Sequence, residues 1–505
     1  MDGALTLGRW IRDRRVATPE RIAIDADGQA ITYAQLEARS ARLAAGLPAL
    51  GAGHGARVAV LAENRPETVE VLFACARAGA MLLPLNRRLA PAELAYQLDD
   101  AEVDLLLVAP DHDALADAAL GEARVRPSRR SLTRDGLDTL AAAAGDTPTT
   151  SVSDDDPLLL IYTSGTTGRP KGALLTHANC FWTNLSLDRT IDVTTTDVVL
   201  QVLPQFHVGG WNVQPLLAWW KGATVVLEAD FDPVRVLELI QSKQVTTMMG
   251  VPAIYQQLAA TSGFDTADLT SLRQAVVGGA PMPEPLIHTW LERGVTLVQG
   301  YGLTEAAPNV LGLPAEHVTD RVGFAGRPYP HVEVALADTD TGEHLDGPGT
   351  GELLVRGPNV FAGYWHNPEA TAAAFADGWL ATGDVAERDA DGFYRIRDRT
   401  KDMYVSGGEN VYPAEVESVL HAHPAVADAA VIGVPDERWG EAGLAVVVSA
   451  PGAQVEAEEL RAHCGERLAR FKVPREVVFV DDLPRSSVNK VLKTELADRF
   501  VGPVR

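Results

Sequence analysis

The sequence predicts an α/β fold with a large N-terminal domain of parallel α/β subdomains, an antiparallel β subdomain and a small α+β C-terminal domain. Apolar residues at helical spacing over 34–50 precede the buried-strand pattern of 57–61, and this alternation continues along the chain. Alternating helices and strands are typical of parallel sheets covered by helices. After residue 320 the pattern changes to short strands separated by turns, which is typical of an antiparallel sheet.

The individual elements follow from local patterns. Residues 67–80 have the apolar spacing of a helix, whereas 81–85 and 105–108 are short apolar runs of the kind that form buried strands. Three short strands are expected in the antiparallel subdomain: 332–336, 351–355 and 393–396. Helix and strand patterns then continue to the end of the chain for about 100 residues, which is enough for a compact domain. We therefore predict an N-terminal domain over 1–398 and a C-terminal domain over 403–505.

Composition and charge limit the class of protein. Of the 505 residues 46% are hydrophobic and 22% are charged, which is ordinary for a globular protein of more than one domain. The formal net charge of −24 repels phosphate backbones, so nucleic acid is not an expected partner. The longest apolar stretch, 198–220, contains several polar residues, so no integral membrane segment is expected.

Cysteine usage and the first residues predict a cytoplasmic protein. Cys75, Cys180 and Cys464 lie far apart without paired spacing, so neither a disulfide framework nor a zinc site is expected. The chain begins without the basic and apolar regions of a secretory signal. The sequence leaves the oligomeric state open.

A loop rich in Gly, Ser and Thr follows the apolar run 158–161. In such a loop backbone N–H groups and hydroxyls turn toward one point and cradle phosphate oxygens, and Lys171 adds a positive charge. The loop departs from the Walker pattern because Pro170 stands where that motif has its second glycine. Taken alone, the loop fits phosphate binding and a flexible surface loop equally well.

Seven motifs, in order and spacing, resemble those of the adenylate-forming superfamily. The family includes acyl-CoA synthetases, firefly-type luciferases and peptide-synthetase adenylation domains, and the resemblance covers nearly the whole chain. The motifs lie at 162–172, 278–281, 299–305, 381–384, 398–402, 406–410 and 485–490. The resemblance implies an ATP-dependent acid–thiol ligase, which activates a carboxylate as its acyl-adenylate and then passes the acyl group to coenzyme A. It also implies that the C-terminal domain is mobile and that 399–402 is its hinge.

The residue types suit this chemistry. When a carboxylate attacks the α-phosphorus of ATP and pyrophosphate leaves, charge builds on the phosphoryl oxygens and is stabilised by cations and N–H donors. By the resemblance Glu305 is the ligand of Mg²⁺, a role that fits a hard carboxylate oxygen. Lys490 resembles the catalytic lysine, and Thr163 is assigned to the catalytic group with them. The preceding Asn489 departs from the glycine of many relatives.

The resemblance also implies the ATP-binding residues. Tyr301 is expected to stack on adenine, and Asp384 and Arg399 to contact the ribose. The alternatives are a solvated loop carboxylate for Glu305, a turn aspartate for Asp384 and a surface ion pair for Arg399. The full expected set is Thr163, Ser164, Gly165, Thr166, Thr167, Gly168, Lys171, Gly279, Ala280, Pro281, Gly300, Tyr301, Gly302, Thr304, Asp384, Arg399 and Lys490.

For the second half-reaction the resemblance points to a rotating C-terminal domain. Lys401 matches the hinge position, and Ser406, Gly407 and Gly408 match the loop that lines the tunnel for coenzyme A. Glycines in such a loop allow the backbone to approach the pantetheine arm closely. A charged linker without a hinge role is the alternative.

The acid pocket is expected around six residues that resemble the pocket walls of fatty-acyl and aryl-CoA ligases. Trp211 resembles a tryptophan that gates the acyl tunnel, with a buried core tryptophan as the alternative. No arginine is placed to pair a second carboxylate, so an apolar monocarboxylate is expected. A medium-to-long fatty acid comes first, and an aryl acid of the hydroxycinnamate or benzoate kind second. The six residues are His207, Trp211, Val251, Gly278, Gly302 and Leu303.

Two other functions remain to be distinguished from this one. An adenylation enzyme that loads a separate carrier protein has the same motifs. A noncatalytic nucleotide-binding relative is disfavoured by the joint presence of five residues that the resemblance places in the reaction: Lys171, Glu305, Asp384, Arg399 and Lys490.

Overall fold

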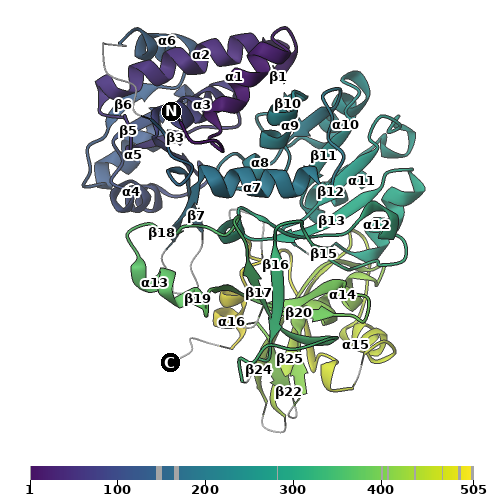
Figure 1. The fold of residues 1–505 in the computed structure, drawn as a ribbon. Coiled ribbons are helices and arrows are strands. Elements are labelled where there is room, and N and C mark those ends of the chain that lie inside the picture. The colour runs from purple at the N-terminus through teal and green to yellow at the C-terminus, as the bar shows by residue number, and fades with distance from the viewer. Residues whose placement is uncertain are drawn as a thin grey trace.

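The strands of the described residues form four sheets in the computed structural model (Figure 1). The structure describes residues 2–143, 151–163, 170–280, 282–339, 341–399, 402–406, 409–436, 439–468, 470–486 and 491–501. Two of the sheets are mainly parallel and one is antiparallel. The fourth, which contains both antiparallel and parallel pairs, belongs to a smaller C-terminal unit. The predicted fold class is confirmed.

The first large sheet has the strand order β18-β8-β7-β4-β3-β5-β6 and is parallel from β7 to β6. Its helices α1–α6 all come from the N-terminal part of the chain (Figure 1). The strands are β3 (Arg57–Leu61), β4 (Met81–Leu85), β5 (Leu105–Val108), β6 (Ser128–Ser131), β7 (Pro157–Thr163), β8 (Lys171–Thr176) and β18 (Gly363–Tyr364). The helices are α1 (Gly8–Ala17), α2 (Tyr33–Gly46), α3 (Pro66–Ala78), α4 (Pro91–Asp100), α5 (Asp113–Glu122) and α6 (Arg134–Ala142).

The second large sheet has the order β15-β14-β13-β12-β11-β9-β10-β1-β2, with parallel pairing from β13 to β1. Its strands are β1 (Ile22–Ala26), β2 (Gln29–Thr32), β9 (Val198–Gln201), β10 (Thr224–Leu227), β11 (Thr247–Gly250), β12 (Gln274–Val277), β13 (Leu297–Gly302), β14 (Asn309–Gly312) and β15 (Arg327–Pro328). The associated helices are α7 (His177–Asp188), α8 (Gly209–Asn212), α9 (Pro215–Lys221), α10 (Pro233–Ser242), α11 (Pro252–Ala259) and α12 (Glu284–Glu292).

The two large sheets share one hydrophobic core. Helix α7 contacts both β8 of the first sheet and β14 of the second, and it crosses the middle of the molecule in Figure 1. It begins immediately after β8 because Thr176 and Asn179 form a reciprocal capping box. Phe73 of α3 and Trp219 of α9 meet edge to face at 5.8 Å between ring centres, and both are fully buried. The sheets are therefore joined by packing as well as by the chain.

The antiparallel sheet pairs β16-β17-β20-β19, with β21 on β20. Its elements are β16 (Glu333–Ala337), β17 (Gly349–Arg356), α13 (Pro368–Ala373), β19 (Phe375–Ala376), β20 (Trp379–Arg388) and β21 (Tyr394–Arg399). Three of these strands lie where short strands are predicted, although each extends beyond the predicted bounds.

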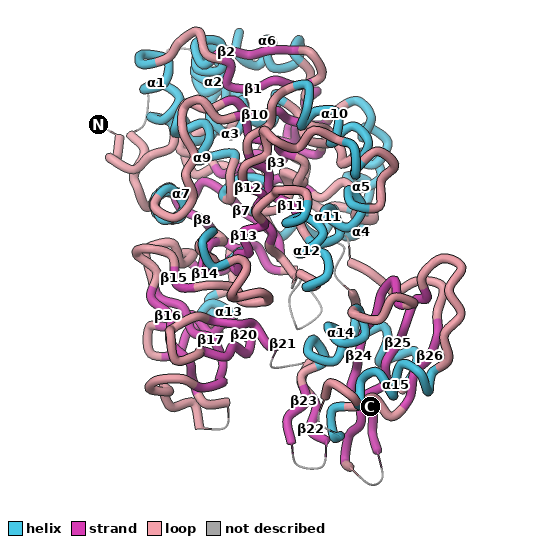
Figure 2. Tube along the Cα trace, turned by 90° about the vertical axis from the view of Figure 1, so that its right-hand side faces the viewer, coloured by secondary structure: helices cyan, strands magenta, loops and turns pink. Residues whose placement is uncertain are grey.

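The C-terminal unit has a sheet and two core clusters of its own, and its helix α14 contacts β21 of the antiparallel sheet (Figure 2). Its elements are β22 (Tyr404–Ser406), β23 (Glu409–Val411), α14 (Pro413–His421), β24 (Val426–Asp436), β25 (Gly440–Ser449), α15 (Ala457–Gly465), β26 (Glu476–Phe479) and α16 (Lys493–Phe500). The sheets change between the end of β21 and the start of β22, in the segment that the sequence analysis assigns to a hinge. The domain bounds and the mobility remain predictions.

Candidate active site

The carboxyl ends of β11, β12 and β13 gather most of the predicted adenine and acid-pocket residues. Val251 follows β11, Gly278, Gly279 and Ala280 follow β12, and Gly302 ends β13. The parallel register places Gly250 beside Val277 and Val277 beside Gln299, so the three strands end at one edge. Ligands of open α/β sheets bind at this edge.

Two glycines at this edge are required by the backbone. Gly279 has φ +81°, a conformation that residues with a side chain rarely adopt. A β-carbon on Gly302 would collide with the carbonyl oxygen of Pro308. Glycine at 279 allows the left-handed turn after β12, and glycine at 302 allows β13 to approach the backbone of Pro308 closely.

Glu305 lies at the centre of a polar cluster next to this edge. It belongs to a short 3₁₀ turn, η4 (Thr304–Ala306), directly after β13. The hydroxyl of Tyr364 donates a hydrogen bond to Glu305 Oε1 at 2.8 Å, and the hydroxyl of Thr163 donates to the same oxygen at 3.3 Å. The Nζ of Lys171 lies 5.1 Å from the ring centre of Tyr364. Predicted residues from two distant motifs thus meet.

The ends of β7 and β8 explain how Thr163 and Lys171 reach Glu305. The two residues face each other across the antiparallel pair, at the mouth of the predicted phosphate loop. Ser164, Gly165, Thr166, Thr167 and Gly168 of that loop lie outside the described residues. Their roles remain predictions.

Tyr364 is a member of the cluster that sequence reasoning missed. It lies on the two-residue strand β18, which pairs with β8 and brings the hydroxyl to Glu305. Burial, reinforced by the nearby charge of Glu305, raises the pKa of Tyr364 above its ordinary value, so the hydroxyl keeps its proton and donates. A strand of two residues has no periodic pattern, so the sequence contains no local signal for it.

The predicted ribose aspartate is bonded to the predicted adenine tyrosine. The hydroxyl of Tyr301, on β13, donates to Asp384 Oδ2, on β20. Asp384 is buried, with 8% of its surface exposed, and its backbone N–H donates to the Thr382 hydroxyl at 3.1 Å. Arg399 is the register partner of Asp384 on β21, and its side chain is outside the described part. The structure therefore brings the second large sheet and the antiparallel sheet together at this point.

Trp211 has the surroundings of a core residue. Its side chain is fully buried, and its indole N–H donates to the carbonyl oxygen of Gln205 at 2.5 Å. This is the alternative that the sequence leaves open for Trp211. His207, from the same segment, packs edge to face on Phe206 with ring centres 4.6 Å apart.

The segment before Trp211 is held by an asparagine that the sequence analysis did not single out. The side-chain amide of Asn64 donates to the carbonyl oxygens of Leu203 and Glu228 at 2.9 and 3.1 Å, and its oxygen accepts the N–H of Gln205 at 2.8 Å. These bonds tie the end of β3 to the second large sheet. They fix the backbone that leads to His207.

The remaining predicted site residues divide into placed and unplaced ones. Ser406 ends β22, is 3% exposed and pairs with Gly440 of β25. Pro281, Lys401, Gly407, Gly408 and Lys490 lie outside the described residues, so their roles stay predictions.

Among the described residues no group of three or more His, Cys, Asp or Glu side chains is arranged to hold a metal ion. Glu305 fits Mg²⁺ as a single protein carboxylate that shares the ion with phosphates, which is how this ion commonly binds.

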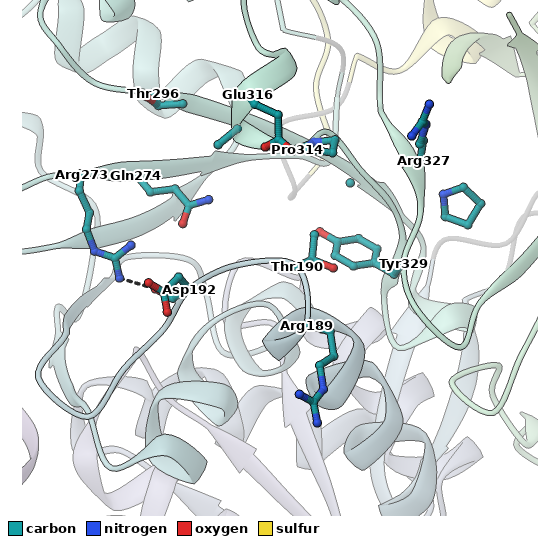
Figure 3. A pocket seen from close by; sticks show the side chains of 13 residues that line it. Arg189, Thr190, Asp192, Arg273, Gln274, Thr296, Pro314, Glu316, Arg327 and Tyr329 are labelled. Carbon is teal, nitrogen blue, oxygen red and sulfur yellow. Dashed lines mark hydrogen bonds between the residues drawn. The ribbon is translucent and has the colours of Figure 1, made fainter. Parts of the chain in front are cut away.

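A separate surface pocket of about 590 Å³ lies at the opposite edge of the second sheet (Figure 3). Arg273, Gln274 and Thr296 line it at the amino ends of β12 and β13. Arg273 is bonded to the carboxylate of Asp197 at 2.8 Å and to the carbonyl oxygen of Asp192. The positive charge of Arg273 is thus paired with a carboxylate of the protein. None of the residues that line this pocket belongs to the predicted site.

The fold and the converging motifs define an enzyme of the adenylate-forming class. The family model for the AMP-binding enzyme matches residues 11–365, and that for the AMP-binding enzyme C-terminal domain matches 415–490. The chain belongs to the AMP-binding enzyme family, in its branch of acyl-CoA synthetases.

Similar proteins match over nearly their whole length. A feruloyl-CoA synthase of Amycolatopsis sp is 46% identical over 494 residues, covering 98% of this chain and 99% of that protein. FadD13, a long-chain-fatty-acid–CoA ligase of Mycobacterium tuberculosis, is 37% identical over 506 residues, covering 99% of each. The crystal structure of ATP-bound MatB from Rhodopseudomonas palustris is similar with a TM-score of 0.90, at 34% identity and full coverage of both chains. In the part of this chain that the structure describes, no helix is long and apolar enough to cross a membrane.

Proposed function

We propose that this acyl-CoA synthetase couples an aryl-substituted monocarboxylic acid to coenzyme A through an acyl-adenylate. In the first half-reaction a carboxylate oxygen bonds to the α-phosphorus of ATP, and the bond to the bridging oxygen breaks so that pyrophosphate leaves. In the second, the thiol sulfur of coenzyme A bonds to the acyl carbon, AMP leaves and the thiol proton is released. The observation that carries the proposal is the meeting of two motifs: Thr163 bonds to Glu305, and Lys171, from the same motif as Thr163, lies over the ring of Tyr364, which also bonds to Glu305.

Each residue of the cluster has a place in the first half-reaction. Lys171 contributes positive charge toward the phosphates, and Glu305 holds Mg²⁺ with Thr163 beside it. When bound, the ion neutralises charge on the phosphates during phosphoryl transfer. Asp384 and Arg399 hold the ribose, and Lys490 approaches the reacting carboxylate from the C-terminal domain. We keep Lys401 as the hinge and Ser406, Gly407 and Gly408 as the tunnel for coenzyme A in the second half-reaction.

We rank an aryl acid above the medium-to-long fatty acid that the sequence analysis expects first. Of the feruloyl-CoA synthase and FadD13, the synthase is the more similar to this chain, at 46% against 37% identity. Gly278, one of the predicted pocket residues, is buried, and a β-carbon on it would lie 3.2 Å from the Gly300 carbonyl oxygen and 3.3 Å from the terminal carbon of Met249, so it packs closely against β11 and β13. A long-chain fatty acid is kept as the second candidate because of the similarity to FadD13.

The deciding experiment measures AMP release for a panel of acids. The panel contains ferulate, cinnamate, benzoate and a series of fatty acids, each with and without coenzyme A. We expect kcat/KM to be highest for a hydroxycinnamate. A maximum among the long fatty acids would favour the second candidate. Replacing coenzyme A by a purified acyl-carrier protein tests the carrier-loading alternative, which requires product with the carrier and none with coenzyme A.

A further inference from the structure

We propose that Tyr364 is a positioning residue that sets the spacing between the proposed magnesium ligand and the proposed phosphate lysine. Its hydroxyl orients the carboxylate of Glu305, and the face of its ring holds the ammonium group of Lys171. The inference rests on the proposed function and adds to it a residue that belongs to none of the seven motifs.

The first contact holds one oxygen of Glu305. Tyr364 donates to Oε1 at 2.8 Å, and Thr163 donates to the same atom at the longer distance of 3.3 Å. Within the described residues the second oxygen, Oε2, accepts no side-chain hydrogen bond. The described side chains therefore fix the carboxylate through one oxygen, and we infer that the other is the one that faces a cation. Without the tyrosine hydroxyl, the longer bond from Thr163 is the one that remains among the described side chains to orient the group.

The second contact holds the lysine. The Nζ of Lys171 lies 5.1 Å from the centre of the Tyr364 ring, within the range of a cation–π contact. Lysine has a flexible four-carbon stem and loses much conformational freedom when it is placed. A ring that is already in position reduces that loss when phosphate binds. The side chain of Tyr364 thus contacts both the carboxylate of Glu305 and the ammonium group of Lys171.

The backbone around Tyr364 is fixed at several points. Its N–H donates to the hydroxyl of Thr371 at 2.9 Å, and Tyr364 is the register partner of Ala173 on β8. The next residue, Trp365, donates its backbone N–H to the carbonyl oxygen of Gly172 at 2.7 Å. Strand β18 is therefore bonded directly to the strand that carries Lys171. A tyrosine held in this way can transmit a defined geometry.

A packing role for the ring is the simpler alternative. The ring of Tyr364 meets that of Phe361 edge to face at 4.9 Å. If packing were its only role, Tyr364→Phe would leave nucleotide binding unchanged, because the phenylalanine ring occupies the same space. The hydroxyl and the ring face can therefore be tested separately.

The test measures ATP binding by calorimetric titration on the full-length protein, with Mg²⁺ and with EDTA, in the absence of acid and coenzyme A. We expect Tyr364→Phe to weaken the Mg²⁺-dependent part of ATP affinity roughly tenfold, the effect of one hydrogen bond to a charged group. Affinity in EDTA should be unchanged, because the ring under Lys171 remains. Tyr364→Leu should weaken ATP binding in EDTA as well, and that additional loss should vanish in a Lys171→Ala background.

A double-mutant cycle and a matched control make the result specific. In a Glu305→Gln background Tyr364→Phe should have little further effect, since the bonded charge is gone. Tyr33→Phe removes another buried tyrosine hydroxyl, which lies at the start of α2, outside this cluster, and donates to the carbonyl oxygen of Ala223 at 2.6 Å. It should lower the melting temperature without changing the Mg²⁺ dependence.

The outcomes separate the inference from the proposed function. If the unaltered protein binds Mg·ATP and Tyr364→Phe binds it equally well, the inference is overturned and the proposed function stands. A loss of equal size in the wild-type and Glu305→Gln backgrounds also overturns it. If the unaltered protein shows no Mg²⁺-dependent ATP binding, the proposed function fails, and the inference fails with it.

Discussion

At the residue scale, Glu305 is the position where charge should matter most. Replacing its carboxylate by an amide keeps the shape of the side chain and removes the net charge. We expect Glu305→Gln to raise the Mg²⁺ concentration for half-maximal activity roughly tenfold, because an amide oxygen is a poorer ligand for a hard cation. Glu333→Gln is the control, since Glu333 pairs with Arg356 on the exposed face of the antiparallel sheet. An identical Mg²⁺ titration for both variants would remove Glu305 from the metal site.

Trp211 is the second residue whose replacement separates two roles. Its full burial and its indole hydrogen bond favour a structural role over a gate. We expect Trp211→Ala to lower the free energy of unfolding by about 3–5 kcal/mol and to reduce kcat/KM for all acids by a similar factor. Chemical denaturation and the acid panel measure the two effects. A changed preference among acids at nearly wild-type stability would instead identify Trp211 as a gate.

At the element scale, the turn η4 that carries Glu305 is held by a buried asparagine. The side-chain amide of Asn359 donates to the carbonyl oxygens of Ala306 and Asn309 at 2.8 and 3.1 Å, and the residue is fully buried. Asparagine can bond two carbonyl oxygens because its nitrogen carries two protons. The turn and the start of β14 are thus kept at a fixed separation.

We expect Asn359→Asp to destabilise the protein by about 2–5 kcal/mol, because a carboxylate would face two carbonyl oxygens without a donor. The variant should also need more Mg²⁺, since the turn of Glu305 loses its support. Melting curves and the Mg²⁺ titration measure these effects. The matched control is Asn367→Asp at the start of α13, where the side-chain oxygen accepts the N–H of Ala370 at 2.9 Å. Aspartate accepts equally well there and complements the helix N-terminus, so wild-type stability is expected.

The elements also differ in how far the sequence predicted them. The strands β3, β4 and β5 have the predicted bounds because parallel strands buried on both faces form continuous apolar runs. The residues at the carboxyl ends of β12 and β13 are predicted through the motifs that they belong to. Tyr364, Asn64 and Asn359 were not, because a hydrogen bond between residues far apart in the sequence leaves no local pattern. Trp211 was ambiguous, since an apolar surround fits a pocket and a core alike.

At the scale of the whole molecule, a buried histidine links stability to pH. His177 begins α7 and joins it to the N-terminal segment, because its Nδ1 accepts the N–H of Leu7 at 3.2 Å. Burial lowers the pKa of His177 to about 4, from an ordinary value of 6.5, although Asp156 and Asp154 oppose the shift. Between these pH values the unfolded chain binds a proton that the folded chain does not. Stability should therefore fall as the pH drops from 6.5 to 4.

The size of this effect follows from the shift and amounts to about 3 kcal/mol over the full interval. Urea denaturation at several pH values measures it. In His177→Asn the difference between neutral and acidic pH should shrink by this amount, whereas His288→Asn, on the exposed side of α12, should behave as wild type. Equal pH dependence in all three proteins would show that other groups cause the acid sensitivity.

The pairing of distant strands has a consequence for the making of the protein. Strand β1 can pair with β10 only after residue 225 has been synthesised, because Ile24 is the register partner of Val225. Strand β8 can pair with β18 only after residues 363 and 364 have been synthesised. A growing chain therefore exposes sheet edges on the ribosome for a long part of its translation. The polar cluster around Glu305 gains Tyr364 only when β18 has been synthesised, after all the other strands of both large sheets. We expect nascent chains that end before this strand to depend on chaperones, because their unpaired sheet edges can associate with other chains.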